Sequence, residues 1–384
     1  MKLFGQRRKG LTVLISLVLL SLVMAACGAG GGTPPPSSGA PSSAAPVNGK
    51  GCTKVGILLP ETASSARWEQ QDHPLLVKDI TAALGSGGSV DFANAEGNDA
   101  TQVSQAEADL TKGDCILVVA PHDAAVAATI VAKAKAQQVP VISYDRLIQS
   151  KDLAYYVSFD NVMVGALQGG YVADHYKDFI KPGHTNVAMI DGSMTDNNAL
   201  LFSQGAHSKL DPLFSSGALK KVYEKFTPDW NNATAQTEME GALTASHNDI
   251  QIAYVANDGM ANSVIAALKA QHLNGKVLVT GQDATDAGIH NILAGDQSMT
   301  VYKAIAKEAQ GTADLIKALV AGSDTASLTN GATVKTADGT AIPSVLETPV
   351  AVDKTNIAST VIADGFVTKA DVCKGIPAGT DGVC

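Results

Sequence analysis

Recognisable catalytic signatures are absent from this chain of 384 residues. The sequence has no His-Glu-x-x-His motif of metalloproteases, no Gly-x-Ser-x-Gly elbow of esterases and no Gly-x-x-x-x-Gly-Lys-Ser/Thr loop of nucleotide hydrolases. Cys-x-x-Cys pairs and close Cys/His clusters are also missing, which argues against a zinc site. We expect no metal or cofactor. The missing motifs do not exclude an enzyme, because two carboxylates could still act as general acid and base.

An excess of positive charge is missing as well. The chain has 37 acidic residues against 28 Lys and Arg, and its formal net charge is −9. Such a surface argues against nucleic acid or anionic lipid as the main partner. The lack of a basic DNA-reading segment further argues against a cytoplasmic repressor.

The N-terminus has the pattern of an export signal. Basic residues precede an apolar stretch at 11–26, which is short for a membrane span. Met24-Ala25-Ala26-Cys27 resembles a bacterial lipobox, so we predict a lipoprotein signal peptide at 1–26 and lipidation of Cys27; an uncleaved membrane anchor is the alternative. Residues 27–51 are rich in Gly, Pro and Ser, which predicts a flexible tether. We therefore expect an exported protein held at the outer face of the membrane by an N-terminal lipid.

Short apolar runs alternate with helical patterns along the rest of the chain, which is typical of parallel sheets covered on both faces. A body of this length also exceeds what one core usually supports. We predict an α/β fold of two doubly wound lobes joined by several strands, one lobe from 52–160 plus 304–345 and the other from 161–303 plus 346–384. The polar stretch 322–348, with turn signals at Asn330-Gly331 and Asp338-Gly339, predicts a hairpin-like connection and no helix. The expected strands are 55–59, 90–93, 116–120, 139–143, 187–190, 222–226, 252–256 and 277–280, and the expected helices include 123–137 and 198–210.

The cysteines beyond Cys27 are even in number, which suits an oxidising compartment. Four cysteines allow three pairings. Cys52 and Cys115 stand at the starts of the first and third strands, which are neighbours in a sheet of order 2-1-3-4-5. We therefore predict a disulfide between Cys52 and Cys115, and a second one between Cys373 and Cys384.

Polar clusters end many of the predicted strands, where ligands bind in open α/β sheets. Carboxylates, amides and guanidinium groups there would suit a small polyhydroxylated ligand. Each cluster has a structural alternative. Asp145-Arg146 could be a surface salt bridge, Asp283 could cap the next helix, and Lys303 could be a solvated surface residue. For Asn161 and Asn197 we favour helix capping over ligand contact.

Trp68 and Trp230 are the only two tryptophans, and both stand in polar, loop-like segments. An indole face could cover the C–H face of a sugar ring while polar groups meet its hydroxyls. Ordinary core packing is the alternative for each.

Eight motifs, taken in order, resemble those of the D-xylose-binding proteins of bacterial ABC importers, within the type I periplasmic sugar-binding family. They are Ala66-Arg67-Trp68, Ser143-Tyr144-Asp145-Arg146, Ser158-Phe159-Asp160-Asn161, Thr195-Asp196-Asn197-Asn198-Ala199, Asp229-Trp230, Ala256-Asn257-Asp258, Gly281-Gln282-Asp283 and Thr300-Val301-Tyr302-Lys303. The resemblance implies a monomeric two-lobed protein, not an enzyme, that closes on a pentose and presents it to a membrane permease. It implies ligand contacts from Arg67, Trp68, Asp145, Arg146, Asp196, Asn198, Trp230, Asn257, Asp283 and Lys303.

The chain departs from the family pattern in the loop at 61–66, where Ala66 replaces the usual acidic residue before Arg-Trp. This departure bears on which sugar is preferred. A receptor of the same fold that reports to a membrane sensor is the alternative to a transport protein.

Overall fold

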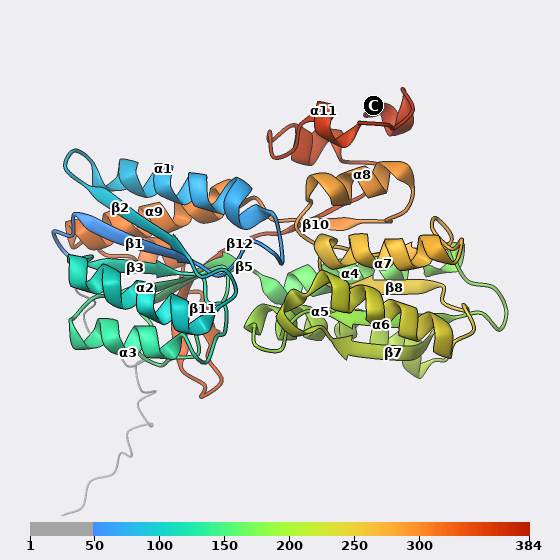
Figure 1. The fold of residues 1–384 in the computed structure, drawn as a ribbon, viewed down its shortest axis with the longest axis horizontal. Coiled ribbons are helices and arrows are strands. Elements are labelled where there is room, and N and C mark those ends of the chain that lie inside the picture. The colour runs from blue at the N-terminus through green and yellow to red at the C-terminus, as the bar shows by residue number, and fades with distance from the viewer. Residues whose placement is uncertain (1–48) are drawn as a thin grey trace, which may run out of the picture. The chain divides into compact units, whose positions relative to one another are not determined.

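The first sheet contains seven strands in the order β11-β12-β5-β4-β3-β1-β2 (Figure 1). The computed structural model describes residues 49–384, so the predicted signal peptide, Cys27 and most of the tether lie outside the described residues. Strands β1 to β5 are parallel and have the predicted order 2-1-3-4-5. Their bounds are Lys54–Leu59 (β1), Ser89–Asn94 (β2), Ile116–Val119 (β3), Val141–Tyr144 (β4) and Tyr155–Phe159 (β5); Thr333–Lys335 (β11) and Ala341–Glu347 (β12) return from far along the chain.

Helices cover both faces of this sheet, which explains why its central strands are almost continuously apolar. One apolar cluster joins the sheet to α1 (His73–Leu84) and α9 (Ile305–Ala321). Another joins it to α2 (Asp99–Lys112) and α3 (Ala128–Ala136). A single π-helical turn, η1 (Trp68–Asp72), leads into α1.

The second sheet contains four parallel strands in the order β7-β6-β8-β9. A separate antiparallel pair, β10 with β13, lies beside it. Val301 of β10 belongs to the apolar cluster that forms the core of the second sheet. The strands are Asn186–Asp191 (β6), Lys220–Phe226 (β7), Ile252–Val255 (β8), Leu278–Val279 (β9), Thr300–Tyr302 (β10) and Val350–Val352 (β13). The helices are Asn161–His175 (α4), Asn197–Ser215 (α5), Asn232–Ala245 (α6), Asp258–Ala270 (α7) and Asp286–Ala294 (α8), with short 3₁₀ turns at Tyr176–Asp178 (η2) and Pro228–Trp230 (η3).

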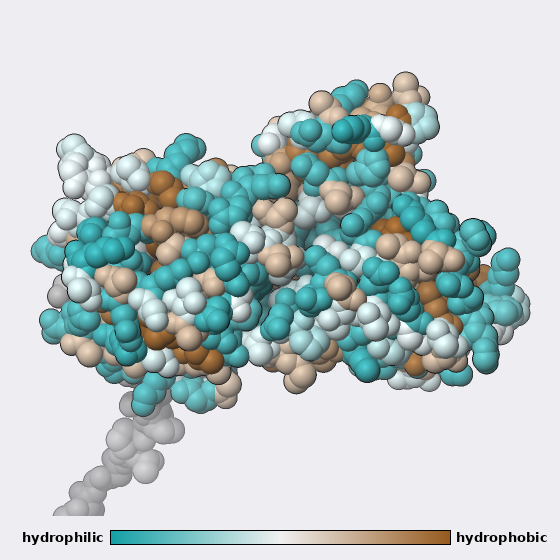
Figure 2. Space-filling view, in the orientation of Figure 1, coloured by the Kyte–Doolittle hydropathy of each residue, from teal (hydrophilic) through white to brown (hydrophobic). Residues whose placement is uncertain are grey.

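The chain passes three times between the first sheet with its helices and the second sheet with its helices and the β10–β13 pair. These connections run from β5 to α4, from β10 to α9, and from β12 to β13. Both sheets nevertheless belong to one compact unit. We call the part around the first sheet the first lobe and the part around the second sheet the second lobe. Hydrophilic residues cover most of the face seen in Figure 2, since the apolar runs are buried in these sheets.

Three predicted elements differ from the observed ones. Helix α3 begins at Ala128, not at 123, because the Asp123 carboxylate accepts from the backbone of Ala125 and Val126 and holds a turn there. Helix α5 continues to Ser215, well past the predicted end at 210. The polar stretch does form the β11–β12 hairpin, but a short helix, α10 (Ala326–Thr329), precedes it.

The C-terminal segment packs on the second lobe beside α8 (Figure 1). It contains η4 (Ala358–Ile362), α11 (Lys369–Val372) and η5 (Thr380–Gly382). Its apolar side chains form a small core with Ile289, Ile292 and Tyr302. No helix in the described range 49–384 is both long and apolar enough to cross a bilayer.

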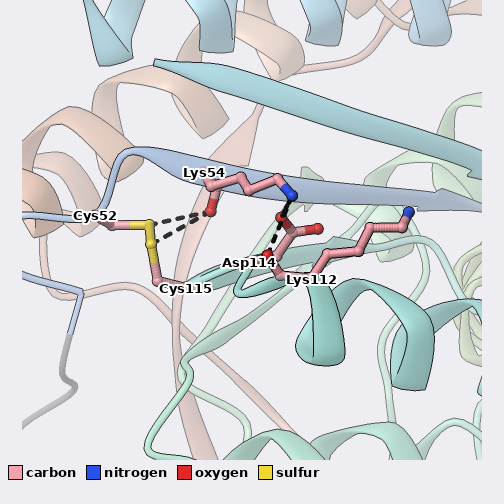
Figure 3. The surroundings of a disulfide bond; sticks show 5 residues. All are labelled: Cys52, Lys54, Lys112, Asp114 and Cys115. Carbon is pink, nitrogen blue, oxygen red and sulfur yellow. Dashed lines mark hydrogen bonds and ion pairs between the residues drawn. A yellow bond between two sulfur atoms is a disulfide. The ribbon is translucent and has the colours of Figure 1, made fainter. Parts of the chain in front are cut away.

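Both predicted disulfides are present. Cys52 and Cys115 join the starts of β1 and β3, and both sulfur atoms approach the carbonyl of Lys54 (Figure 3). Cys373 and Cys384 close a loop in the C-terminal segment. The argument from neighbouring strands therefore selected the right pairing.

Candidate functional site

A polar pocket with about 310 Å³ of atom-free space lies where the carboxyl ends of the two sheets face each other. All ten residues that the resemblance implied as ligand contacts line it. Arg67, Trp68, Asp145 and Arg146 come from the first lobe, and Asp196, Asn198, Trp230, Asn257, Asp283 and Lys303 come from the second. The structure thus brings the whole predicted set together. Their contact with a sugar stays a prediction.

Arg67 is held by three carboxylates. Its Nε and Nη2 donate to the two oxygens of Asp72 at 2.8 and 2.6 Å, and Nη2 also donates to Glu308 at 3.1 Å. Its Nη1 donates to Asp145 at 2.7 Å. These bonds use four of the five N–H donors of the guanidinium, which leaves one donor on Nη1.

Arg146 pairs with one carboxylate from each lobe. Its Nη2 donates to Glu61 at 2.8 Å, and its Nε lies 3.0 Å from Asp196 across the pocket. Both Arg146 and Asp145 are at most 5% exposed. The pair is therefore not the surface salt bridge that was the alternative, and the two side chains bond to other partners.

Asp145 has an unusual backbone that its surroundings stabilise. Its φ of 55° lies in the left-handed region, which costs a non-glycine residue free energy. Its carbonyl accepts from the hydroxyls of Tyr156 and Ser158, both at 2.7 Å, and from the amide of Asn198 at 2.9 Å. The turn aims the carboxylate at Arg67 and at the Lys303 ammonium, 3.0 Å away.

The pocket carboxylates differ in proton affinity. Burial alone would raise the pKa of Asp145, but the charges of Arg67 and Lys303 outweigh it and hold that pKa below the usual range. Burial raises the pKa of Asp283 and of Asp196, and the nearby cations only partly offset it. Asp145 therefore remains ionised more readily than the two carboxylates of the second lobe.

Asp283 lies on a strained turn after β9. Its φ is 102° and that of Ala284 is 50°. Its carboxylate accepts from Ser65 at 3.0 Å and from Gln282 at 2.5 Å, and lies 3.8 Å from the Lys303 nitrogen. The cap of α8 is Thr285, so Asp283 is not the helix cap that was the alternative.

The two tryptophans have different surroundings. Trp230 packs edge-on against Phe202, donates from Nε1 to Asp196 at 3.1 Å, and covers Gly192, where a Cβ would collide with its ring. Trp68 has the guanidinium carbons of Arg67 and Arg146 at 4.7 and 5.2 Å from its ring centre. Trp68 thus supports two arginines by cation–π contact, whereas Trp230 is an aromatic wall of the pocket.

Capping was predicted wrongly for Asn161 and Asn197. Asp160 caps α4 and Asp196 caps α5, each one residue earlier than predicted. Asn161 instead donates to the side-chain oxygens of Tyr156 and Asn198. A carboxylate at the preceding position is an equally good cap and takes that role.

Capping and pocket contact are compatible in one residue. Asp196 and Asn257 both cap a helix with one side-chain oxygen and line the pocket as well. Helix capping and a place in the pocket, which the sequence analysis treated as alternatives, therefore occur together in these two residues.

Sequence reasoning missed four lining residues: Ser64, Ser65, Phe202 and Gln282. It also missed the carboxylates that support the arginines. Glu61 and Asp72 follow β1, and Glu308 is on α9, 241 positions from Arg67. These three carboxylates are distinguished by their burial, and burial can be seen only in the folded structure.

A group of carboxylates that could hold a metal ion, Asp91, Asp109 and Asp114, lies near the amino ends of β1 and β3, away from the pocket. The ammonium groups of Lys54 and Lys112 already pair with it, and Figure 3 shows the pair of Lys54 with Asp114. Burial and the two neighbouring carboxylates raise the pKa of Asp114 to about 6. The group is a charge-paired cluster, and none of its members lines the pocket.

A family model described as a periplasmic binding protein domain matches residues 55–324. The chain belongs to this periplasmic binding protein family. D-xylose-binding periplasmic proteins of Haemophilus influenzae and Escherichia coli are 39% and 38% identical to it over 322 residues, which cover 83% of this chain and 92% of each relative. Among solved structures, an ABC transporter solute-binding protein of Clostridium phytofermentans with bound β-D-glucose superposes with a TM-score of 0.73 at 30% identity, over 83% of this chain and 99% of that one.

These matches confirm the family and the two-lobed fold that the ordered motifs implied. The family model begins in the first strand and ends in the C-terminal third, so its range includes all eight motifs. Export, as in periplasmic relatives, follows from the family. Lipidation of Cys27 lies outside the described residues.

Proposed function

We propose that this protein captures a monosaccharide, with D-xylose as the preferred ligand, and delivers it to an ABC importer. The observation that supports this most strongly is the pocket between the lobes, where three cationic and three anionic side chains converge with two tryptophans. Such a mixture of donors and acceptors suits a small ring that carries a hydroxyl on most of its carbons.

Each charged group has a role in this proposal. Arg67, Arg146 and Lys303 donate to sugar hydroxyls, while Asp145, Asp196 and Asp283 accept from them. Asn198 and Asn257 add amide contacts, and Trp230 covers the ring face. Because these groups are buried, an analogue that lacks one hydroxyl would leave a charged partner unpaired and bind poorly.

Capture proceeds by closure of the two lobes about their three connections, the motion for which periplasmic binding proteins are known. Side-chain contacts already cross between the lobes at the pocket: Asn198 and Lys303 reach Asp145, and Ser65 reaches Asp283. A bound sugar would stabilise the closed arrangement by bonding to both sides at once.

The preference for a pentose rests on the D-xylose-binding relatives. A hexose is the competing ligand, because a structural neighbour at 30% identity binds β-D-glucose. The loop at 61–66 is where the two preferences would diverge. In this chain Glu61 accepts a hydrogen bond from Arg146. Its role in the proposal is therefore to orient an arginine that binds the sugar.

Lipid attachment at Cys27 would keep the monomeric protein near its permease, with residues 27–51 as the tether. Mass spectrometry of the mature N-terminus tests this directly: a diacylated Cys27 supports it, and an unmodified chain that begins elsewhere contradicts it. A Cys27→Ser variant should be released from the membrane fraction.

Intrinsic fluorescence offers a first test of sugar capture, because both tryptophans line the pocket. D-xylose should change the emission in a saturable way, and the sugar should be recovered unchanged after long incubation. Consumption of the sugar would show that the protein is an enzyme and would contradict the proposed binding function. No response to any monosaccharide would contradict the proposal.

A further inference from the structure

Asp258 does not line the pocket, yet it is fully buried directly behind it. It is the first residue of α7, immediately after the pocket residue Asn257. Its carboxylate accepts four hydrogen bonds. Oδ2 accepts from the backbone and the hydroxyl of Thr285, at 2.9 and 3.2 Å, and Oδ1 accepts from Gln297 and Thr300, both at 2.8 Å.

These bonds surround the turn that carries Asp283. The Asp258 backbone N–H donates to the carbonyl of Gln282 at 2.9 Å, before the turn. The Thr300 hydroxyl, which donates to Asp258, accepts from the backbone of Ala284 at 3.2 Å. Asp258 therefore contacts the residues on both sides of Asp283, either directly or through Thr300.

The turn needs such support, because it contains two consecutive non-glycine residues with positive φ, Asp283 and Ala284. Residues in this conformation persist only where their surroundings hold them, and they cluster at ligand sites. The turn is also tied to β10 by two backbone bonds that do not involve Asp258. The Asp283 N–H donates to the carbonyl of Val301 at 2.9 Å, and the Val301 N–H donates to the carbonyl of Gly281 at 3.1 Å.

Two glycines make the close approach of Asp258 possible. A Cβ at Gly281 or at Gly288 would collide with its carboxylate oxygens. The chain thus lacks side chains at the two positions where they would displace this carboxylate, one before the Asp283 turn and one in α8.

We propose that Asp258 is a positioning residue for sugar binding: it holds the strained turn that aims the carboxylate of Asp283 into the pocket. This inference rests on the proposed function, in which Asp283 accepts from a sugar hydroxyl. Asp258 itself touches no ligand and acts through Asp283.

The variant Asp258→Asn is nearly isosteric but places an NH₂ group against donors. We expect it to weaken the Kd for D-xylose about tenfold or more, with little change in volume. The matched control is Asp191→Asn. Asp191 is a buried carboxylate at the end of β6 in the same lobe, and neither of its oxygens has a hydrogen-bond partner among residues 49–384. The control should leave the Kd within about twofold.

A double-mutant cycle separates positioning from general destabilisation. If Asp258 acts through Asp283, then Asp258→Asn should cost little further affinity, less than about twofold, in an Asp283→Asn background. These titrations would extend to near-saturated sugar so that a weak Kd is still measured. Equal losses in both backgrounds, or no loss in the wild-type background, would overturn the inference.

Hydrogen exchange of the protein without sugar provides a second readout. Asp258→Asn should accelerate exchange at the amides of Ala284 and Thr285 while the first lobe is unchanged. Unchanged exchange at these amides, or faster exchange throughout the chain, would contradict the inference that Asp258 stabilises this turn locally. If wild-type protein binds no sugar, the proposed function fails, while this exchange measurement still decides whether Asp258 holds the turn.

Discussion

The two lobes build their halves of the pocket by different means. In the first lobe, Arg67 and Arg146 are fixed by the buried carboxylates of Asp72, Glu308 and Glu61. In the second lobe, the pocket groups stand at helix caps and on strained turns after the strands. The comparison teaches that the arginines of the first half depend on charge pairing, whereas the second half depends mainly on backbone geometry. Asp145 of the first half combines the two, since it pairs with Arg67 and has a left-handed backbone.

This difference predicts that mutations in the two halves will differ in how much they reduce stability and how much they reduce sugar binding. Removing a charge from the first half should damage stability as well as binding, because buried partners lose their counter-ion. Removing the carboxylate of Asp283 from the second half should damage binding and leave the unliganded fold nearly intact, because the backbone of its turn is held by other residues.

The largest effect is expected for Arg67→Met. It leaves Asp72, Asp145 and Glu308 in a buried site without a shared cation, and breaking such pairs costs about 3–5 kcal/mol. Sugar binding should be lost, and the unliganded protein should melt well below wild type in calorimetry. Arg67→Lys retains a charge but not the planar fork, and should recover stability only in part. If Arg67→Met melted at the wild-type temperature, the claim that charge pairing in the first half of the pocket stabilises the fold would be wrong.

Asp283→Ala should have the next largest effect. Loss of a buried charged acceptor should weaken the Kd for D-xylose by roughly 100-fold, or about 2.7 kcal/mol. The melting temperature without sugar should stay within about 2 °C of wild type, because the turn retains its bonds to Asp258 and Val301. A large fall in apo stability with preserved affinity would instead make Asp283 a structural residue.

Trp230→Ala and Trp68→Ala should separate an aromatic wall from a support for arginines. Trp230→Ala removes the proposed stacking surface and should weaken the Kd about tenfold, in line with aromatic contacts of about 1–1.5 kcal/mol. For Trp68→Ala we expect a similar loss that disappears when Arg146 is also changed to Met, since its ring meets the two guanidinium groups. Independent losses in the double variant would show that Trp68 contacts the sugar itself.

Acidification should produce the smallest effect and should protonate Asp196 and Asp283 before Asp145. Burial raises the pKa of Asp196 and Asp283, whereas cations hold that of Asp145 below its usual range. Sugar hydroxyls need ionised acceptors, so binding favours deprotonation, and affinity should fall as the pH is lowered. We expect a several-fold rise in Kd between about pH 8 and about pH 4.5, which a titration series measures. The rise should shrink in Asp283→Asn, and an unchanged profile there would assign it to another group.

Much of the fold and the pocket could be predicted from strand endings alone, because parallel strands must bring their carboxyl ends to one edge. Asp145, Asn257 and Asp283 were found in this way. The caps at Asn161 and Asn197 were predicted wrongly because neighbouring Asp and Asn residues compete for one role. Glu308 could not be predicted, because only the return of α9 to the first lobe brings it to Arg67.

The central claim is that the pocket between the lobes binds one monosaccharide. Titration calorimetry of the wild-type protein with D-xylose, D-ribose, L-arabinose, D-glucose and D-galactose tests it most directly. We predict single-site binding with D-xylose as the tightest ligand, and a Kd roughly 100-fold weaker in Asp283→Ala. No heat with any of the five sugars, or equal heat in Asp283→Ala, would contradict the account.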